Sequence, residues 1–164
     1  MKKIIVFLST ILLFNLVGCE NSKLKIAQEV AQEIMEVFVA EDIEALYSLL
    51  SHNAQNYPNI REQIREAFDF IDGEIISYEL PTDTGGGGKD IKHGKVTHEN
   101  ITPWIENIET DSGKMYLIGF RYDLVFESDK NAEGLGNIMI DLLDERKRMV
   151  ERLGIGIDVE RFPR

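Results

Sequence analysis

The sequence predicts an α+β fold in which three N-terminal helices pack on a four-stranded antiparallel sheet. Apolar residues recur with a helical period of about 3.6 up to Gly73 and with a strand period of about 2 after it. The later segments are joined by turns rich in Gly, Asp and Ser, which is typical of an antiparallel meander. A chain whose helices precede its strands in this way is α+β, because only the helices can cover one face of the sheet.

Three segments carry the helical pattern. Residues 24–39 have an apolar stripe on one face and glutamates on the others. Residues 43–50 follow a candidate N-cap, Asp42. The third segment follows Asn59, with Glu62 three residues later as in a capping box, and continues to the change of period.

Four segments carry the strand pattern: residues 74–80, 96–109, 116–126 and 138–142. The second contains Pro103, which indicates an edge position or a bulge because proline cannot donate to a ladder. The third alternates most regularly. The side chains on its outward face are unusually apolar for a face in contact with solvent. A second copy of the chain could pack on this face to form a homodimer.

The domain is expected to span residues 24–143. Residues 144–164 form a tail that begins charged, with a run that can form a helix, and ends apolar. The sequence pattern does not place this tail on the domain.

The N-terminus predicts export and lipid attachment. Lys2 and Lys3 precede a short apolar run, residues 4–14, which is too short for the roughly 20 residues that span a bilayer. The residues Leu16-Val17-Gly18-Cys19 resemble the lipobox of bacterial lipoproteins. The resemblance implies cleavage after residue 18, with residues 1–18 as signal peptide, and two acyl chains on Cys19 that hold the protein stably on a membrane.

The net charge and the length of the tether limit the possible partners of the exported protein and its distance from the membrane. The 18 basic residues less Lys2 and Lys3 leave 16 against 29 acidic ones, a net charge of −13 after cleavage. This charge argues against nucleic acid as a partner. It also argues against electrostatic adhesion to anionic lipid, so the acyl chains must hold the domain against that repulsion. Residues 19–23 span at most about 14 Å. We therefore expect a domain held close to the extracytoplasmic face of the cell membrane through acylated Cys19.

Three patterns that imitate ion or phosphate sites fail on spacing, so no cofactor or metal is predicted. Residues 85–89 lack the earlier glycine and the Ser or Thr of a phosphate loop, which favours a mobile connection. Residues 129–140 place Ile140 where a calcium loop needs a bidentate Glu. His93 and His98 are five positions apart, an odd spacing that directs them to opposite faces of a strand.

Several segments resemble a known family. They are residues 68–78, residues 105–126 and the sequence Glu133-Gly134-Leu135. Across residues 24–142 the chain resembles the bacterial lipoproteins grouped as domain of unknown function 5104. That resemblance implies the nuclear transport factor 2-like, or cystatin-like, cone fold, in which a curved sheet wraps a helix and leaves a pocket. Enzymes, binding modules and dimerisation domains share this fold, so it does not decide function.

The sequence favours a non-catalytic domain that binds a small ligand or an envelope protein. Tyr78, Trp104 and Tyr122 are the candidate pocket-lining residues, because each joins a large apolar surface to one polar group. The alternative is a pocket enzyme of the isomerase or dehydratase type, for which Asp69 and Asp72 supply acids near these aromatic residues. No catalytic residue can be assigned on this basis.

Overall fold

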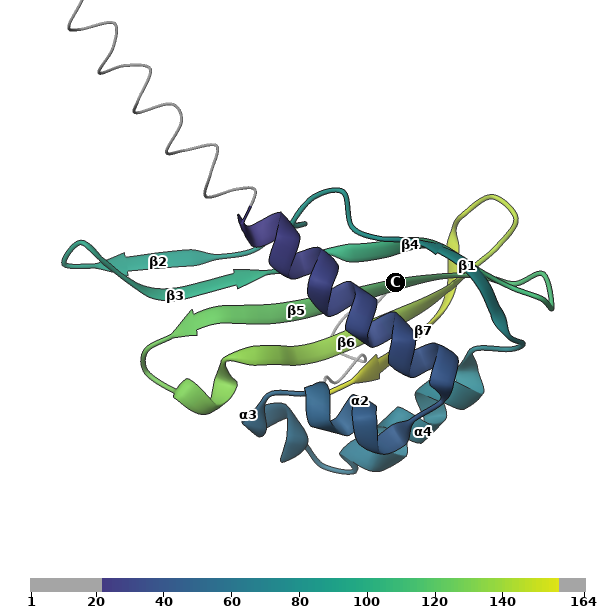
Figure 1. Ribbon diagram of the computed structural model, residues 1–164, viewed down its shortest axis with the longest axis horizontal. Helices are drawn as coiled ribbons and strands as arrows, with labels where there is room; N and C mark the ends of the chain where they lie inside the picture. The colour runs from purple at the N-terminus through teal and green to yellow at the C-terminus, as the bar shows by residue number, and fades with distance from the viewer. Residues whose placement is uncertain (1–21, 157–164) are drawn as a thin grey trace, which may run out of the picture.

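The computed structural model describes residues 22–156, in which helices lie on one face of a strongly twisted antiparallel sheet (Figure 1). The described part of the N-terminal helix covers residues 22–40. The later helices are α2 (Ile43–Leu49), α3 (His52–Gln55), α4 (Ile60–Phe70) and the 3-10 turn η1 (Lys130–Ala132). The strands are β1 (Ile75–Glu79), β2 (Lys89–Lys92), β3 (Lys95–Ile101), β4 (Trp104–Thr110), β5 (Met115–Phe126), β6 (Gly134–Leu143) and β7 (Met149–Ile155).

Strand β5 is the centre of the sheet. Its first half pairs with β4 and its second half with β3, so these two strands follow each other along one edge of β5. β1 lies outside β4, and β2 lies outside β3. On the other edge β5 pairs with β6 along nearly its whole length, and β6 pairs with β7.

The strand break between β3 and β4 falls at Thr102 and Pro103. The backbone N–H of Thr102 donates to the carbonyls of Thr84 and Gly86, both at 3.1 Å, so the glycine-rich loop supplies the acceptors that a continuous strand would have. A side chain at Gly85 would place its Cβ 1.9 Å from the Thr102 carbonyl oxygen. This glycine loop is therefore packed against the sheet, and the proline breaks the predicted 96–109 strand in two.

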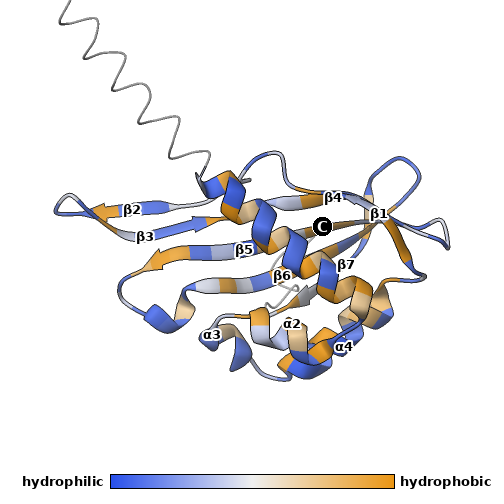
Figure 2. Ribbon diagram, in the orientation of Figure 1, coloured by the Kyte–Doolittle hydropathy of each residue, from blue (hydrophilic) through white to orange (hydrophobic). Residues whose placement is uncertain are grey.

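The core lies between the sheet and the helices, and Figure 2 shows that the N-terminal helix carries apolar and polar residues on different sides. Its apolar side buries Ala31, Ile34, Met35 and Phe38. These residues meet side chains that alternate along β4, β5 and β6, as expected for one face of a pleated sheet. The buried sheet residues include Ile105, Ile108, Tyr116, Ile118, Phe120, Ile138 and Ile140.

The chain is α+β, but the predicted arrangement of three helices on a four-stranded, nuclear transport factor 2-like sheet is wrong. The structure has four helices and seven strands within residues 22–156. α3, β2 and β7 were missed, and β7 occupies the part of the tail for which a helix was considered. α3 has only four residues and all four residues of β2 are exposed, so neither carries a hydrophobic period; β7 is interrupted by Glu151, Arg152 and Gly154.

Two predicted helix caps have different outcomes. The Asp42 carboxylate accepts from the backbone N–H groups of Glu44 and Ala45, as predicted. Asn59 stands at the N-cap of α4 but adopts the left-handed conformation and makes no side-chain cap bond. The predicted capping box is therefore wrong. Among residues 22–156, no helix has the length and apolar character needed to cross a bilayer.

Candidate functional site

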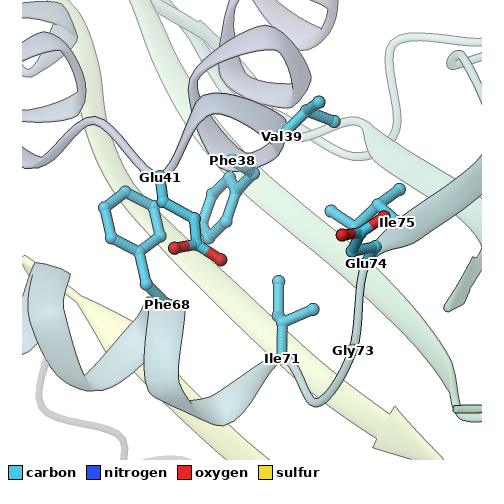
Figure 3. A pocket seen from close by; sticks show the side chains of 8 residues that line it. All are labelled: Phe38, Val39, Glu41, Phe68, Ile71, Gly73, Glu74 and Ile75. Atoms are coloured by element: carbon cyan, nitrogen blue, oxygen red, sulfur yellow. The ribbon is translucent and has the colours of Figure 1, made fainter. Parts of the chain in front are cut away.

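The candidate site is a pocket where three elements meet: the C-terminal end of the N-terminal helix, the end of α4 and the start of β1 (Figure 3). Its volume is about 200 Å³. The lining residues are Phe38, Val39, Glu41, Phe68, Ile71, Gly73, Glu74 and Ile75. This is the region in which the helical period of the sequence gives way to the strand period.

Five of the eight residues that line the pocket have apolar side chains. Phe38 and Phe68 meet edge to face, with ring centroids 5.2 Å apart and an interplanar angle of 86°. Phe38 is buried, Phe68 and Ile71 are half-buried, and Val39 at the rim is 58% exposed. The pocket therefore has a fixed aromatic wall and an apolar edge that remains in contact with solvent.

Glu41 enters the pocket from an unusual backbone conformation. The N-terminal helix ends with the N–H of Asp42 donating to the Val37 carbonyl and the N–H of Glu41 donating to the Phe38 carbonyl, both at 3.3 Å. This is the Schellman pattern, in which the residue at the position of Glu41 is left-handed and is usually glycine. Glu41 has φ 51°, a conformation that an L-residue with a Cβ disfavours. Figure 3 shows its carboxylate beside the Phe38 ring and turned toward the pocket.

Glu74 lies on the opposite side of the pocket (Figure 3). Its N–H donates to Asp111 Oδ1 at 2.9 Å, and its carbonyl accepts from the Asp111 N–H at 2.9 Å. The preceding Gly73 has φ 91°, and a Cβ there would lie 2.4 Å from the same Asp111 oxygen. The turn before Glu74 thus requires glycine, and the β4–β5 turn holds the Glu74 backbone in place.

Neither pocket carboxylate has an ion-pair partner within residues 22–156. The nearby cation Lys114 instead binds Asp72 Oδ2 at 2.8 Å, a hydrogen bond that raises the pKa of Lys114. The chemistry of the pocket is therefore that of an aromatic and aliphatic wall between two exposed carboxylates. Such a site attracts a cation that carries some apolar surface.

The three predicted pocket residues do not meet at one site. The Tyr78 hydroxyl donates to Gln32 Oε1 at 3.5 Å, beneath the N-terminal helix. Tyr122 lines a separate, open cavity of about 560 Å³ between that helix and the β5–β6 pair. Trp104 packs against Gly119, which alternates with the buried Ile118 and Phe120 and so faces the other side of the sheet.

A charged cluster around Asp123, which lines the same cavity as Tyr122, was missed by the sequence reasoning. Asp123 is only 5% exposed and receives two hydrogen bonds from Arg121, at 2.8 and 3.0 Å. His98 Nε2 lies 3.0 Å from Asp123 Oδ1, and Asn100 Nδ2 lies 3.3 Å from the same nitrogen. The sequence signal was two opposite charges at alternate positions of the most regular strand, which places them on one face.

The other candidate residues are dispersed. Asp69 is exposed on α4 and Asp72 binds Lys114, so the two acids considered for catalysis do not share a cavity with Tyr122. His93 stands in the β2–β3 turn with φ 51°, away from the His98 cluster. No group of three or more His, Cys, Asp or Glu side chains within residues 22–156 is arranged to hold a metal ion. Cys19 lies outside the described residues.

Comparison with known proteins agrees with the resemblance noted in the sequence. A search of curated proteins gave no match. The sequence profile of one family matches residues 33–148, which include both phenylalanines and both carboxylates of the pocket. Because this match covers more than half of the chain, the protein belongs to the family described as a domain of unknown function, DUF5104.

Proposed function

We propose that the protein is a lipid-anchored, non-catalytic binding domain of the cell envelope whose pocket accepts a protonated amine with a small apolar body. The observation that carries this proposal is the pair Glu41 and Glu74, which face one aromatic-walled pocket without a cationic partner in residues 22–156. Acylated Cys19 would hold the domain on the extracytoplasmic face of the membrane.

Physical complementarity favours an amine over other ligands. An ammonium group gains from the two carboxylates, and an apolar body gains from contact with the Phe38 and Phe68 side chains that line the pocket. A volume of about 200 Å³ is below the roughly 300–1,000 Å³ of sites that bury drug-sized ligands. The pocket therefore suits a headgroup or a side-chain terminus, with the rest of the ligand lying across the exposed Val39. An anion would be repelled by both glutamates.

The alternative function, a pocket enzyme, finds its best support in the buried Asp123 beside His98. A general base needs a ring nitrogen that can reach substrate. His98 Nε2 instead lies within 3.3 Å of both Asn100 Nδ2 and Arg121 Nη2, besides Asp123, and Nδ1 faces the Asp90 carboxylate at 3.7 Å. This arrangement fixes the imidazole between charged neighbours, so the binding function is the better supported of the two.

A titration of the full lipoprotein in detergent micelles tests the proposal, with n-butylammonium as probe and n-butanol as its uncharged match. Ligand-observed NMR should show binding of the amine and much weaker binding of the alcohol. Glu41→Gln and Glu74→Gln should each weaken amine binding about fivefold, the effect of one exposed ion pair. Glu33→Gln is the matched control, because Glu33 lies on the same helix but lines the Tyr122 cavity.

Two results would overturn the amine proposal. One is equal binding of n-butylammonium and n-butanol, which would show that charge plays no part. The other is amine binding that falls with Glu33→Gln but not with the two pocket variants. That result would move the ligand site to the Tyr122 cavity.

A further inference from the structure

The first described turn of the N-terminal helix is joined to the hairpin formed by β2 and β3. The Lys23 ammonium group donates to the Glu99 carboxylate on β3, and Lys89 Nζ of β2 lies 3.2 Å from the same carboxylate oxygen. Glu99 is only 12% exposed, so this contact is largely shielded from solvent. The hairpin and the first described turn of the N-terminal helix therefore form one unit.

The tip of this hairpin differs in charge from the rest of the protein. Residues 91–97 contain Lys92, His93 and Lys95 and no carboxylate, whereas the protein after cleavage would carry a net charge of −13. Ile91 is 60% exposed, and every residue from 89 to 95 is exposed. Three carboxylates lie behind the tip: Glu99 contacts Lys23 and Lys89, Glu127 contacts Lys95, and Asp90 Oδ2 lies 3.7 Å from His98 Nδ1. Of the two tip lysines, Lys92 has no ion-pair partner among residues 22–156 and Lys95 is paired with Glu127.

Both the lipid anchor at Cys19 and the tip of the hairpin lie within about 20 Å of chain from the Lys23–Glu99 contact. Cys19 is at most about 14 Å from Lys23, because Lys23 is the fourth residue after it. The turn at Gly94 is five residues along the hairpin from Glu99, or about 17 Å at the rise of a strand. Figure 1 shows the β2–β3 hairpin projecting beyond the other strands, away from the β4–β5 and β6–β7 turns. A domain tethered at Lys23 can thus bring this tip to the membrane surface.

We infer that the tip of the β2–β3 hairpin, residues 91–97, docks on anionic lipid headgroups and sets the orientation of the domain on the membrane. This inference rests on the proposed lipid anchor at Cys19. The acidic remainder of the domain is repelled by an anionic surface. The tip is attracted mainly through Lys92, with Lys95 adding less because it is paired with Glu127, and Ile91 can enter the interface. Since the attraction decays within about 8 Å at physiological salt, only the tip contributes to it.

Fluorescence quenching of the lipidated protein in vesicles tests the inference. With Cys19 acylated, an introduced cysteine is the only free thiol, so His93→Cys labels the tip and Glu145→Cys labels the turn between β6 and β7 at the opposite end of the sheet. Vesicles carry a headgroup-level nitroxide lipid, with or without phosphatidylglycerol in a phosphatidylcholine background. We expect strong quenching at position 93 that requires phosphatidylglycerol, and weak quenching at position 145 in both.

Charge reversal supplies the matched control. Lys92→Glu with Lys95→Glu should lower the ratio of docked to undocked orientations by about fivefold or more for each lysine. Arg65→Glu with Arg146→Glu makes the same change in net charge at exposed sites outside the hairpin and should leave quenching at position 93 unchanged. Equal quenching at both labels in vesicle-bound protein overturns this inference alone. Protein that fails to sediment with vesicles at all overturns the anchor, and this inference with it.

Discussion

Trp104 and Gly119 are paired across β4 and β5, and the Trp104 ring lies so close to Gly119 that no larger side chain fits there. A Cβ added at Gly119 would lie 2.6 Å from the nearest carbon of the Trp104 ring. The ring therefore covers the outer face of β5 at the point where that strand has no side chain of its own. This contact, rather than a pocket, accounts for the tryptophan on the outer face.

Gly119→Ala should destabilise the protein by about 1–3 kcal/mol, because the added methyl group forces the indole off its site. Chemical denaturation followed by far-UV circular dichroism gives the free energy of unfolding. The double variant with Trp104→Ala should lose most of this penalty, as residues in direct contact show non-additive effects. Additive losses would mean that the ring does not occupy the space above Gly119.

Phe120→Ala should cost about 3–5 kcal/mol, because this ring is 3% exposed in the centre of the core. Phe68 is half-buried at the pocket wall, so Phe68→Ala should cost clearly less. The two variants are compared by urea unfolding of the same preparation. A larger loss at Phe68 than at Phe120 would contradict the assignment of Phe68 to a pocket wall.

Glu41→Gly should raise the free energy of unfolding by up to about 1 kcal/mol, because glycine adopts the left-handed conformation without the clash of a Cβ. The same change removes one pocket carboxylate and should weaken binding of n-butylammonium. Thermal unfolding and the amine titration measure the two effects on one variant. Glu36→Gly, inside the same helix, is the control and should lower stability instead.

Stability should fall in acid partly through Glu99. Burial raises the pKa of this carboxyl, but hydrogen bonds from Lys23 and Lys89 outweigh burial and hold the folded-state pKa below its ordinary value. The stabilisation is therefore fully present above the ordinary pKa of about 4.3 and is lost as pH falls through the lower folded-state pKa. Glu99→Gln should cost about 1 kcal/mol at pH 7. Urea unfolding at several pH values should show that this difference shrinks below about pH 4.

Cys19→Ala should abolish acylation and membrane association without changing the unfolding transition of the domain. Labelling of cells with a fatty acid, followed by fractionation, measures the first effect, and denaturation of the purified variant measures the second. A variant that is still labelled and still sediments with membranes would contradict the proposed anchor.

The sequence pattern located most of the core elements because they bury regular apolar faces. Residues 116–126 alternate cleanly and form β5, and the three predicted helical stripes all fold as helices. β2 was not visible because all four of its residues are exposed. β7 was predicted as part of a charged tail because its local sequence contains Glu151 and Arg152. The structure shows that Arg152 donates to Asp141 on the neighbouring strand β6, at 2.6 and 2.7 Å. An ion pair between two strands cannot be recognised from the hydrophobic pattern of either strand alone.

The candidate site was less accessible to sequence reasoning than the fold. Phe38 and Phe68 each belong to an apolar stripe, and nothing in either stripe shows that the rings meet edge to face. Glu41 reads as an ordinary polar residue after a helix, since its left-handed backbone depends on the Schellman bonds. Tyr78, Trp104 and Tyr122 were grouped by residue type, but the Trp104 side chain lies on the opposite face of the sheet from the two tyrosines.

The Lys23–Glu99 contact joins residues 76 positions apart, so it can form only after the chain has been synthesised beyond β3. Hairpins such as β4–β5 and β6–β7 join consecutive segments and can close as soon as both strands have been made. The N-terminal helix is made first, yet the surface that buries Ile34 and Met35 is complete only when β6 and β7 have followed. Its apolar stripe therefore spends most of chain elongation without its native cover.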